Sequence, residues 1–390
     1  MSVSVAVFGL AAVAVLWTLA GYPLLLAWRA RRGGRTLSPA VGLVDLPTVT
    51  AIIPVHNGGR FLEAKLASVL DADYPAERLE IIVLSDGSTD ETDAIATAAA
   101  AASDRVRFVR LPKGGKAVAL TTAFTMTDRD VLLLTDVRQH LDRQCLRHLV
   151  NRLGDPQVGV VSGTLKIRSG ETAGEASTGL YWRYESWIRT NLSTIDSVLG
   201  ATGPIYVIRR ALARPLPAGC ILDDMWLPLQ PVLDGYRSVL SAEAVAWDFP
   251  TSLSSEFARK VRTQAGLYQL FGLEPRLLNP ARNRSFWTFV NLKLLRLLLP
   301  HLLLTALVAS VFLHPPLRVL ALLAQGLFYG AAISDRFVPE SSVLKRLTAP
   351  IAAFVTLVWA AFCAQAIFFR DPATLWKPTL VRDVAAGQAP

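Results

Sequence analysis

Long apolar runs stand toward both ends of this 390-residue chain, and shorter ones alternate with polar segments between them. The first, Val3 to Trp28, carries no charged residue. Three more predominantly apolar runs cover Leu294–Leu313, Leu317–Ile333 and Leu347–Phe369. A bilayer is crossed by a helix of about 20 apolar residues. The pattern therefore predicts about four transmembrane helices, one N-terminal and about three C-terminal.

The charges beside the first apolar run predict its orientation. Arg29, Arg31, Arg32 and Arg35 follow it directly, and positive charge is enriched on the cytoplasmic side of membranes. A cleavable signal peptide would carry positive charge before its apolar run instead, so we expect an uncleaved anchor. The segment from Asn283 to Phe289 is expected to be an interfacial helix before the second span.

Short apolar runs alternate with amphipathic segments in the middle of the chain, from Pro47 onward. Strands are predicted at Val49–Val55, Leu79–Leu84, Val106–Val109 and Val131–Leu134, and helices at Phe61–Leu70, Asp90–Ala102 and Lys116–Met126. This alternation is typical of an α/β domain with a mainly parallel sheet and helices on both faces. Farther along, Gly200–Arg209 is expected to be a turn and a strand, and Leu222–Leu233 a loop that enters a helix.

Aspartates follow two of the predicted strands. Asp86 comes after the second strand and Asp136 after the fourth, which places both at the sheet edge where open α/β folds bind ligands. The pair Asp223–Asp224 precedes a predicted helix. Aspartates also form turns and helix caps without any ligand, and that alternative stays open for Asp86 and for the pair.

Bulk composition narrows the class of protein. A hydrophobic content of 52% and a mean hydropathy of +0.37 suit a membrane protein. The net charge of +9 suits attraction to anionic lipid or phosphate. No dense Lys/Arg run is present, so nucleic-acid binding is not expected. The three cysteines are isolated from one another, which argues against a zinc site or a disulfide framework.

Six short motifs in order carry a resemblance to a known family. They are Ala51–Asn57 (AIIPVHN), Ser85–Thr92 (SDGSTDET), Gly114–Leu120 (GGKAVAL), Thr135-Asp136, Gly200–Pro204 (GATGP) and Asp223-Asp224. Together they resemble membrane-bound family 2 glycosyltransferases, the group that includes hyaluronan, chitin, cellulose and poly-N-acetylglucosamine synthases. The resemblance implies a GT-A-type, Rossmann-like mixed-sheet domain. We expect an anchor at 1–28, that domain at 45–272, an interfacial helix and C-terminal spans at 283–370, and a tail at 371–390.

The resemblance assigns several residues to the nucleotide-sugar donor. It places Asp86 at the nucleoside, Lys116 near the sugar and Arg262 at the diphosphate. The remaining donor-side residues that we expect to bind substrate are Pro54, His56, Asn57 and Thr135. From the residues alone, His56 could be an ordinary loop histidine and Lys116 a solvated lysine. Gly114-Gly115-Lys116 lacks the spacing of a P-loop, although its backbone N–H groups could hold phosphate.

Asp136 stands at the first position of the D-x-D element of this family. The resemblance implies that it binds a divalent cation, Mg²⁺ or Mn²⁺, which prefers oxygen ligands. Arg138 occupies the third position, where the family has a second aspartate. A guanidinium cannot ligate a cation, so Arg138 is expected to pair with a phosphate or with another carboxylate.

On the acceptor side, the resemblance makes Asp224 the general base, with Asp223 supporting it and Gly203 lining the site. Processive relatives carry a Q-x-x-R-W element; here Arg262 matches its arginine, but Arg259 and Thr263 replace the Gln and the Trp. Processivity is therefore open, and Arg259 and Lys260 could be ordinary surface charges. Tyr181, Trp182, Tyr184 and Trp187 could stack on sugars, lie at the lipid interface or pack in the core.

The sequence predicts an integral-membrane inverting glycosyltransferase with its catalytic domain in the cytoplasm, at the inner or plasma membrane. The resemblance implies a nucleoside-diphosphate sugar donor, expected to be UDP-linked and to carry a hexose or N-acetylhexosamine. The acceptor is expected to be lipid-linked or a polysaccharide of the cell envelope. The alternative is a non-catalytic nucleotide-sugar sensor or assembly subunit, which the loss of the second D-x-D aspartate favours. A nucleotidyltransferase fits less well, because it would not need several spans and its usual glycine-rich N-terminal loop is missing here. A transporter fits less well because the spans show no obvious carboxylate path.

Overall fold

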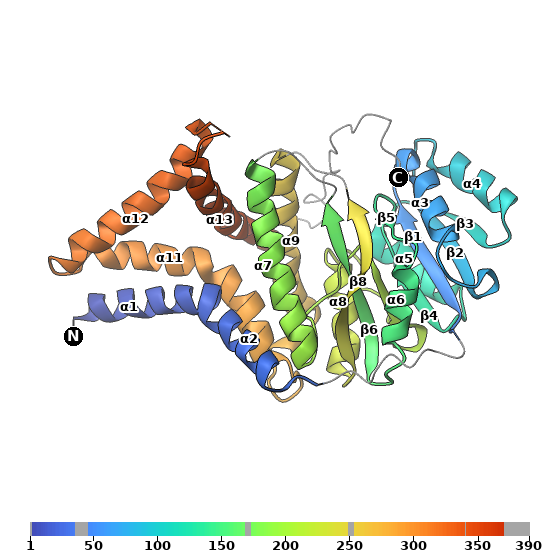
Figure 1. Cartoon of the computed structure of the whole chain (residues 1–390), viewed down its shortest axis with the longest axis horizontal. Coiled ribbons are helices and arrows are strands. Elements are labelled where there is room, and N and C mark those ends of the chain that lie inside the picture. Colours follow the sequence, from blue (N-terminus) through green and yellow to red (C-terminus); the bar gives the residue numbers. More distant parts are fainter. Residues whose placement is uncertain (1, 36–45, 168–172, 249–252, 340, 370–390) are drawn as a thin grey trace.

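The computed structural model describes residues 2–35, 46–167, 173–248, 253–339 and 341–369 (Figure 1). A sheet domain occupies one end of the molecule and long apolar helices the other. Two further long helices, α7 (Ala173–Ile195) and α9 (Leu253–Leu273), stand between these two parts. The expected tail at 371–390 lies outside the described residues.

The sheet has eight described strands in the order β3-β2-β1-β4-β7-β6-β8-β5. Their bounds are β1 Val49–Val55, β2 Leu79–Asp86, β3 Val106–Leu111, β4 Val131–Leu134, β5 His140–Leu141, β6 Val158–Ile167, β7 Tyr206–Arg209 and β8 Arg237–Asp248. Strands β1 to β4 are parallel, as predicted, whereas β7 runs antiparallel to both β4 and β6. The sheet is therefore mixed, as the resemblance implied.

Helices cover both faces of the sheet, and the pleat explains how. Successive strand residues point to opposite faces. In β1, Ile52 belongs to the apolar cluster with Leu120 and Phe124 of α5, whereas Ile53 belongs to the cluster with Leu62 of α3. The helices of the domain besides α7 and α9 are α3 Gly59–Leu70, α4 Thr92–Ala102, α5 Lys116–Thr125, α6 Cys145–Arg152 and α8 Asp223–Leu233.

Within the described residues, four helices are long and apolar enough to cross a membrane: Val3–Gly33, Phe286–Val311, Leu317–Phe337 and Lys345–Phe368. The first comprises α1 (Val3–Leu16), a π-helical turn at Trp17–Gly21 and α2 (Tyr22–Gly33). The second comprises α10 (Phe286–Phe289), a π-helical turn at Val290–Leu294 and α11 (Leu295–Val311). The third and fourth contain α12 (Leu317–Ser334) and α13 (Lys345–Cys363).

This count agrees with the sequence prediction. The interfacial helix expected at Asn283–Phe289 corresponds to α10, and its place at the interface stays a prediction. The helix begins at Phe286 and continues without a break into the second span. Backbone hydrogen bonding is conserved through a π-helical turn, which changes the helix locally without ending it.

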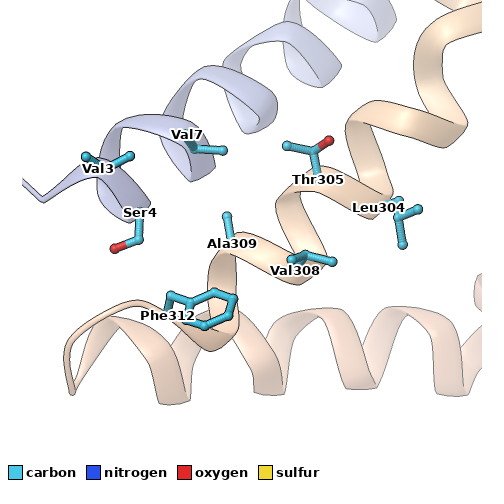
Figure 2. Close-up of a pocket in the computed structure, with 8 residues that line it drawn as sticks. All are labelled: Val3, Ser4, Val7, Leu304, Thr305, Val308, Ala309 and Phe312. Atoms are coloured by element: carbon cyan, nitrogen blue, oxygen red, sulfur yellow. The ribbon is translucent and has the colours of Figure 1, made fainter.

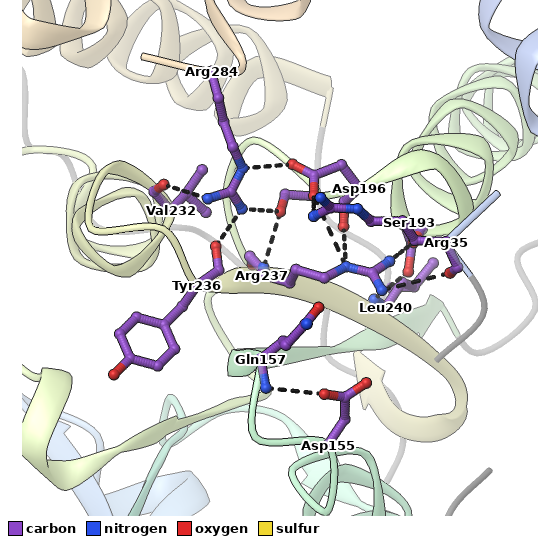
Figure 3. Close-up of polar contacts among 12 residues, drawn as sticks. Arg35, Asp155, Gln157, Ser193, Asp196, Val232, Tyr236, Arg237, Leu240 and Arg284 are labelled. Carbon is purple, nitrogen blue, oxygen red and sulfur yellow. Dashed lines mark hydrogen bonds and ion pairs between the residues drawn. The ribbon is translucent and has the colours of Figure 1, made fainter. Parts of the chain in front are cut away.

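A network of arginines joins the sheet domain to the ends of the apolar helices (Figure 3). The carboxylate of Asp196, just after α7, accepts hydrogen bonds from Arg35, which follows α2, at 3.3 Å and from Arg284, which precedes α10, at 2.9 Å. Arg237, only 1% exposed at the start of β8, donates to the backbone oxygens of Asp196 and Ser193 at 2.9 Å each. These contacts fix the domain against the first and second spans.

An apolar crevice of about 520 Å³ lies between α1 and α11, near the N-terminus (Figure 2). It is lined by Val3, Ser4, Val7, Leu304, Thr305, Val308, Ala309 and Phe312. None of these side chains is charged, and the crevice lies at the end of the molecule remote from the sheet (Figure 1). It therefore offers no charged or ligating group to the sheet edge.

Candidate active site at the carboxyl edge of the sheet

The structure brings three predicted site residues together around one ammonium group. Lys116, the first residue of α5, places its Nζ 2.8 Å from Asp136 Oδ1 and 2.9 Å from Asp223 Oδ2. Asp136 follows β4 and Asp223 opens α8, so three separate elements meet here. We call Lys116, Asp136, Asp223 and Asp224 the carboxylate cluster. Lys116 is thus not the solvated lysine that the sequence also allowed.

Local backbone chemistry holds the members of the cluster in place. Gly115, directly before Lys116, has a φ of +85°, a conformation that favours glycine. Asp223 and Asp224 lie in the first turn of α8, where the helix dipole stabilises negative charge. The N-cap position of α8 is Leu222. The aspartate pair is therefore not the N-cap of this helix.

Mutual charge shifts the pKa values within the cluster. Burial opposes the ammonium of Lys116, but the carboxylates of Asp136, Asp223 and Asp224 outweigh it and raise its pKa. Burial also opposes the carboxylate of Asp136, yet Lys116, Lys65 and Arg138 bring its pKa below the ordinary value. At neutral pH, Lys116 is therefore charged and Asp136 ionised.

Asp224 is shifted in the opposite direction. Burial and the neighbouring charge of Asp223 raise its pKa to about 6, with Lys116 and Arg189 opposing the shift. Such a carboxylate is ionised at neutral pH but is a stronger base than an ordinary aspartate. Those are the properties of a general base that works near pH 7.

Gly203 leaves room for the Asp224 side chain. A Cβ at position 203 would lie 2.9 Å from Asp224 Oδ2, closer than real Cβ contacts permit. The neighbouring Ala201 N–H donates to the Asp224 backbone oxygen at 2.7 Å. The Gly200–Pro204 segment therefore packs directly on Asp224, as expected for residues that line the same site.

Asp86 lies at the carboxyl edge as predicted, but its carboxylate is engaged within the protein. Its Oδ1 accepts hydrogen bonds from the backbone N–H groups of Gly114, at 2.6 Å, and Gly115, at 3.0 Å. Asp86 is only 8% exposed. These two N–H groups, which could hold phosphate on the sequence alone, donate to Asp86 in this structure. Asp86 orders the loop that leads to Lys116.

The segment Pro54–Asn57 is tied to the turn that follows Asp86. His56 Nδ1 lies 2.8 Å from the Asp86 backbone oxygen. Asn57 N–H donates to Ser88 Oγ at 3.1 Å, and Asn57 Oδ1 accepts from Thr89 N–H at 2.8 Å. Pro54 is part of β1. The predicted donor-side residues on these two loops are therefore neighbours.

Thr135 belongs to a buried network that sequence reasoning missed. Its hydroxyl, in a residue 2% exposed, donates to the Pro204 backbone oxygen at 2.7 Å and accepts from Lys65 Nζ at 2.5 Å. Lys65, 1% exposed, also donates to the Gln139 backbone oxygen at 2.7 Å. Burial lowers the pKa of Lys65 to about 7, against the opposing effects of Cys145 and Asp136.

Lys65 thus anchors both ends of the Thr135–Gln139 segment, which contains Asp136. A signal for it existed in the sequence, since Lys65 shares the apolar face of α3 with Leu62 and Val69 at helical spacing. The Thr135 side chain is thereby fixed next to Asp136, and its contact with substrate stays a prediction.

Arg138 pairs with a carboxylate, one of the two alternatives left by the sequence. Its Nε and Nη2 donate to Asp248 Oδ1 at 2.9 Å and Oδ2 at 2.6 Å, and Gln139 Nε2 also donates to Oδ2 at 2.9 Å. Asp248 closes β8 and is 3% exposed. The third position of the D-x-D element is therefore a buried ion pair and offers no oxygen ligand.

Asp136 alone remains to hold a divalent cation from that element. In the described part of the chain, no group of three His, Cys, Asp or Glu side chains is arranged to bind a metal. Asp136 is nevertheless 36% exposed at its side chain, and its Oδ2 accepts no hydrogen bond from the described residues. One carboxylate together with phosphate oxygens and water is sufficient for Mg²⁺. The residues present therefore fit a cation that arrives with a diphosphate.

Two arginines from the intervening helices face the cluster. Burial lowers the pKa of Arg262 on α9. The charges of Asp224, Asp136 and Asp223 oppose that shift. Arg189 of α7, which sequence reasoning missed, donates to Ser162 Oγ at 2.7 Å. Burial lowers the pKa of Arg189, and the charges of Glu185 and Asp224 oppose that shift. Both guanidiniums stay charged at neutral pH.

Comparison with known proteins identifies the domain that carries this site. The family model described as "Glycosyl transferase family 2" matches residues 50–216. Residues 50–216 are a family 2 glycosyltransferase domain. The matched region includes Asp86, Lys116 and Asp136. Asp224 and Arg262 lie beyond it, although the fold brings their charges to the same cluster.

Curated relatives resemble the family 2 domain over part of their length. An N-acetylglucosaminyltransferase of Rhizobium meliloti is 31% identical over 176 residues, 44% of this chain and 41% of the relative. A poly-beta-1,6-N-acetyl-D-glucosamine synthase of Staphylococcus aureus is 24% identical over 239 residues, 60% of this chain and 57% of the relative. The chain thus spans about half the length of these relatives.

One solved structure resembles nearly the whole chain. It is the mannosyltransferase PcManGT from Pyrobaculum calidifontis, solved with GDP-Man and Mn²⁺. The TM-score is 0.69 at 22% identity, over 91% of this chain and 99% of that one. At this level of identity the likeness establishes the fold, and it extends beyond the sheet to most of the helices described above.

Proposed function

We propose that this chain is an integral-membrane inverting glycosyltransferase that uses a nucleoside-diphosphate sugar. The observation that carries the proposal is Asp224, a carboxylate of raised pKa in contact with the small segment around Gly203 and within a cluster that also holds Lys116 and Asp136. A family 2 domain and relatives named as glycosyltransferases support the reaction class.

In the proposed reaction, Asp224 removes the proton from an acceptor hydroxyl. The acceptor oxygen then forms a bond to the anomeric carbon of the sugar while the bond from that carbon to the diphosphate breaks. The electron pair of the broken bond leaves with the nucleoside diphosphate. Lys116 and Arg262 are cations beside the same three aspartates. In the proposed reaction they stabilise the negative charge that develops on the diphosphate. A single displacement inverts the anomeric configuration.

A divalent cation, Mg²⁺ or Mn²⁺, is part of this proposal. Bound to the diphosphate, it would neutralise charge on the departing group. Asp136 Oδ2 is the ligand that the protein would supply, while Asp136 Oδ1 stays paired with Lys116. The structural relative solved with Mn²⁺ and GDP-Man is consistent with a cation in this fold.

The identity of the donor sugar and of the acceptor is inferred from the relatives' names and from the sequence. The relatives' names favour an N-acetylhexosamine donor, and hence the UDP-sugar expected from the sequence, whereas the mannosyltransferase shares only the fold. We infer a lipid-linked or polysaccharide acceptor at the cell membrane. The same proposal includes the domain boundaries expected from the sequence. These are the anchor at 1–28, the cytoplasmic domain at 45–272, the helices at 283–370 and the tail at 371–390.

Nucleotide release from the purified protein in detergent tests this function. A panel of UDP- and GDP-sugars would be supplied with Mn²⁺, Mg²⁺ or EDTA, with and without a membrane-lipid extract as the source of acceptor. Release of one nucleotide, dependent on the cation and on Asp224, is the expected result. Nucleotide binding without release under every condition would contradict it.

A second candidate function is a nucleotide-sugar sensor or assembly subunit. The ion pair between Arg138 and Asp248 favours it, because it removes one oxygen ligand that the family ordinarily offers a cation. A sensor would retain its full cellular phenotype after Asp224→Asn, whereas an enzyme would lose it. That comparison separates the two candidates.

A further inference from the structure

Asp224 has a second set of charged neighbours, on the side of the apolar helices. Arg189 and Glu185 project from α7, and Lys293 and Arg296 come from the start of the second span. Arg296 Nη1 donates to Glu185 Oε1 at 2.5 Å. The charges of Glu185, Arg296, Arg189 and Asp224 all act on Lys293. We call Arg189, Lys293 and Arg296 the cationic cluster.

Lys293 is the member of this cluster that needs an explanation. It lies near the start of a helix long and apolar enough to cross a membrane, and a charged residue in such a helix is rare and marks a functional site by default. No hydrogen bond or ion pair joins its ammonium to another described residue. It also lies within the π-helical turn Val290–Leu294, a rare distortion that is frequent at functional sites.

The cationic cluster lies where the protein meets the expected membrane surface. Tyr184 Oη of α7 donates to the backbone oxygen of Leu19, in the first span, at 2.7 Å. Trp17 Nε1 donates to Asn291 Oδ1 at 2.7 Å, and Tyr22 Oη to Thr288 Oγ1 at 3.0 Å. Aromatic side chains with polar groups favour the level of the lipid headgroups. Lys293 therefore lies at headgroup depth.

The charges indicate what this place can bind. Three cations face one carboxylate, Glu185, besides Asp224, so the described cluster favours an anion. Guanidinium and ammonium groups together bind phosphate oxygens well. A phosphate oxygen is already ionised and needs no base to act as a nucleophile. Because Asp224 is placed as a base, the acceptor group beside it is a hydroxyl, and the anion is a separate part of the same molecule.

We propose that Arg189, Lys293 and Arg296 bind the diphosphate of a membrane-lipid-linked sugar, whose hydroxyl is thereby presented to Asp224. This inference rests on the proposed function, since it names the acceptor class for that reaction. The lipid chain would extend along the second span, which carries Lys293 and Arg296, and along the first span packed beside it. The sugar would extend toward the Gly200–Pro204 segment, because Arg189 Nη2 also lies 3.4 Å from the Gly200 oxygen.

Binding of farnesyl diphosphate to the full chain, in nanodiscs of phosphatidylcholine, tests the inference. Farnesol and inorganic pyrophosphate serve as parallel probes that carry only the chain or only the anion. Farnesyl diphosphate should bind most tightly, and Lys293→Gln should weaken it about tenfold or more, the effect of one charge-assisted contact. Lys293→Arg should retain binding. Arg318→Gln, which removes an exposed cation near the start of α12, is the matched control and should change nothing.

Each arm can overturn the inference. Equal binding of farnesol would remove the role of phosphate, and equal binding of inorganic pyrophosphate would remove the role of lipid. These two comparisons need only the unaltered protein. Unchanged farnesyl diphosphate affinity in a Lys293→Gln protein that still binds UDP would exclude the cationic cluster. Donor turnover is measured separately, so a failure of the proposed reaction would not be confused with a failure of this site.

Discussion

Arg138 and Asp248 form a two-point ion pair across 110 residues of sequence, between the segment after β4 and the end of β8. The pair stands where the family's second D-x-D aspartate would face a cation. Removing one partner of a buried pair leaves the other charge uncompensated, at a cost of about 3–5 kcal/mol. Arg138 thus departs from the family pattern, and Asp248 compensates its charge within the fold.

Restoring the family residue should therefore harm this protein. We expect Arg138→Asp to lower the thermal unfolding midpoint strongly, because its carboxylate would face that of Asp248, and not to strengthen Mn²⁺ binding. The exchange Arg138→Asp with Asp248→Arg should recover part of the stability. Thermal unfolding and cation titration in detergent would measure both, with Asp234→Asn, in a more exposed pair with Arg214, as control. A gain in cation affinity with unchanged stability would contradict this account.

Lys65 should give the protein a distinctive dependence of stability on pH. The unfolded chain keeps a proton on this lysine up to about pH 10.4, whereas the folded chain releases it near pH 7. The cost of burying Lys65 is therefore fully present below pH 7 and is lost as the pH rises toward 10. The unfolding midpoint of the unaltered protein, relative to Lys65→Met, should rise over that interval. A pH-independent difference would show that Lys65 titrates normally in the fold.

Lys116 should set the acidic limit of activity. Its charge lowers the pKa of Asp224, so Lys116→Gln should raise that pKa and move the acidic limb of the pH–rate profile to higher pH. Lys116→Arg should leave the limb close to its original position. An unchanged limb in Lys116→Gln would mean that the two side chains are not coupled during turnover.

Gly203→Ala should slow transfer without unfolding the protein. The added Cβ would meet Asp224 Oδ2 at 2.9 Å, and the flexible carboxylate would move away to relieve the contact. A displacement of about 1 Å at a catalytic group can cost about a hundredfold in rate. We expect this loss in kcat with unchanged nucleotide affinity. Gly272→Ala, whose Cβ would meet no atom within 4 Å, is the matched control; equal rates for the two variants would contradict the expectation.

Much of the fold could be predicted because its signals are local. Strands β1 and β4 begin and end where the apolar runs predicted, and the part of the chain that the structure describes has the four long apolar helices that were expected. The sequence missed β6 and β8, which pair with each other along most of their length. Their partners are set by the long-range order of the sheet, which no local pattern reveals.

The candidate site shows the same division between local and distant information. The family motifs located Asp136, Lys116 and Asp224, and the structure brings them together. They could not reveal that Asp86 holds the Gly114–Gly115 backbone, or that Thr135 is anchored by Lys65. These partners lie on different elements, so only the folded chain shows which hydrogen bonds are already satisfied inside the protein.

The most direct test of the central claim is the transfer rate of Asp224→Asn beside its nucleotide affinity. A general base typically contributes about 10²–10⁴-fold to the rate. We expect turnover of the preferred donor to fall by that order while nucleotide affinity stays unchanged, and the exposed control Asp128→Asn to behave like the unaltered protein. In the unaltered protein, the rate should fall as the pH drops below about 6, where Asp224 becomes protonated. Full turnover by Asp224→Asn would contradict the assignment of Asp224 as the base, and with it the proposed mechanism.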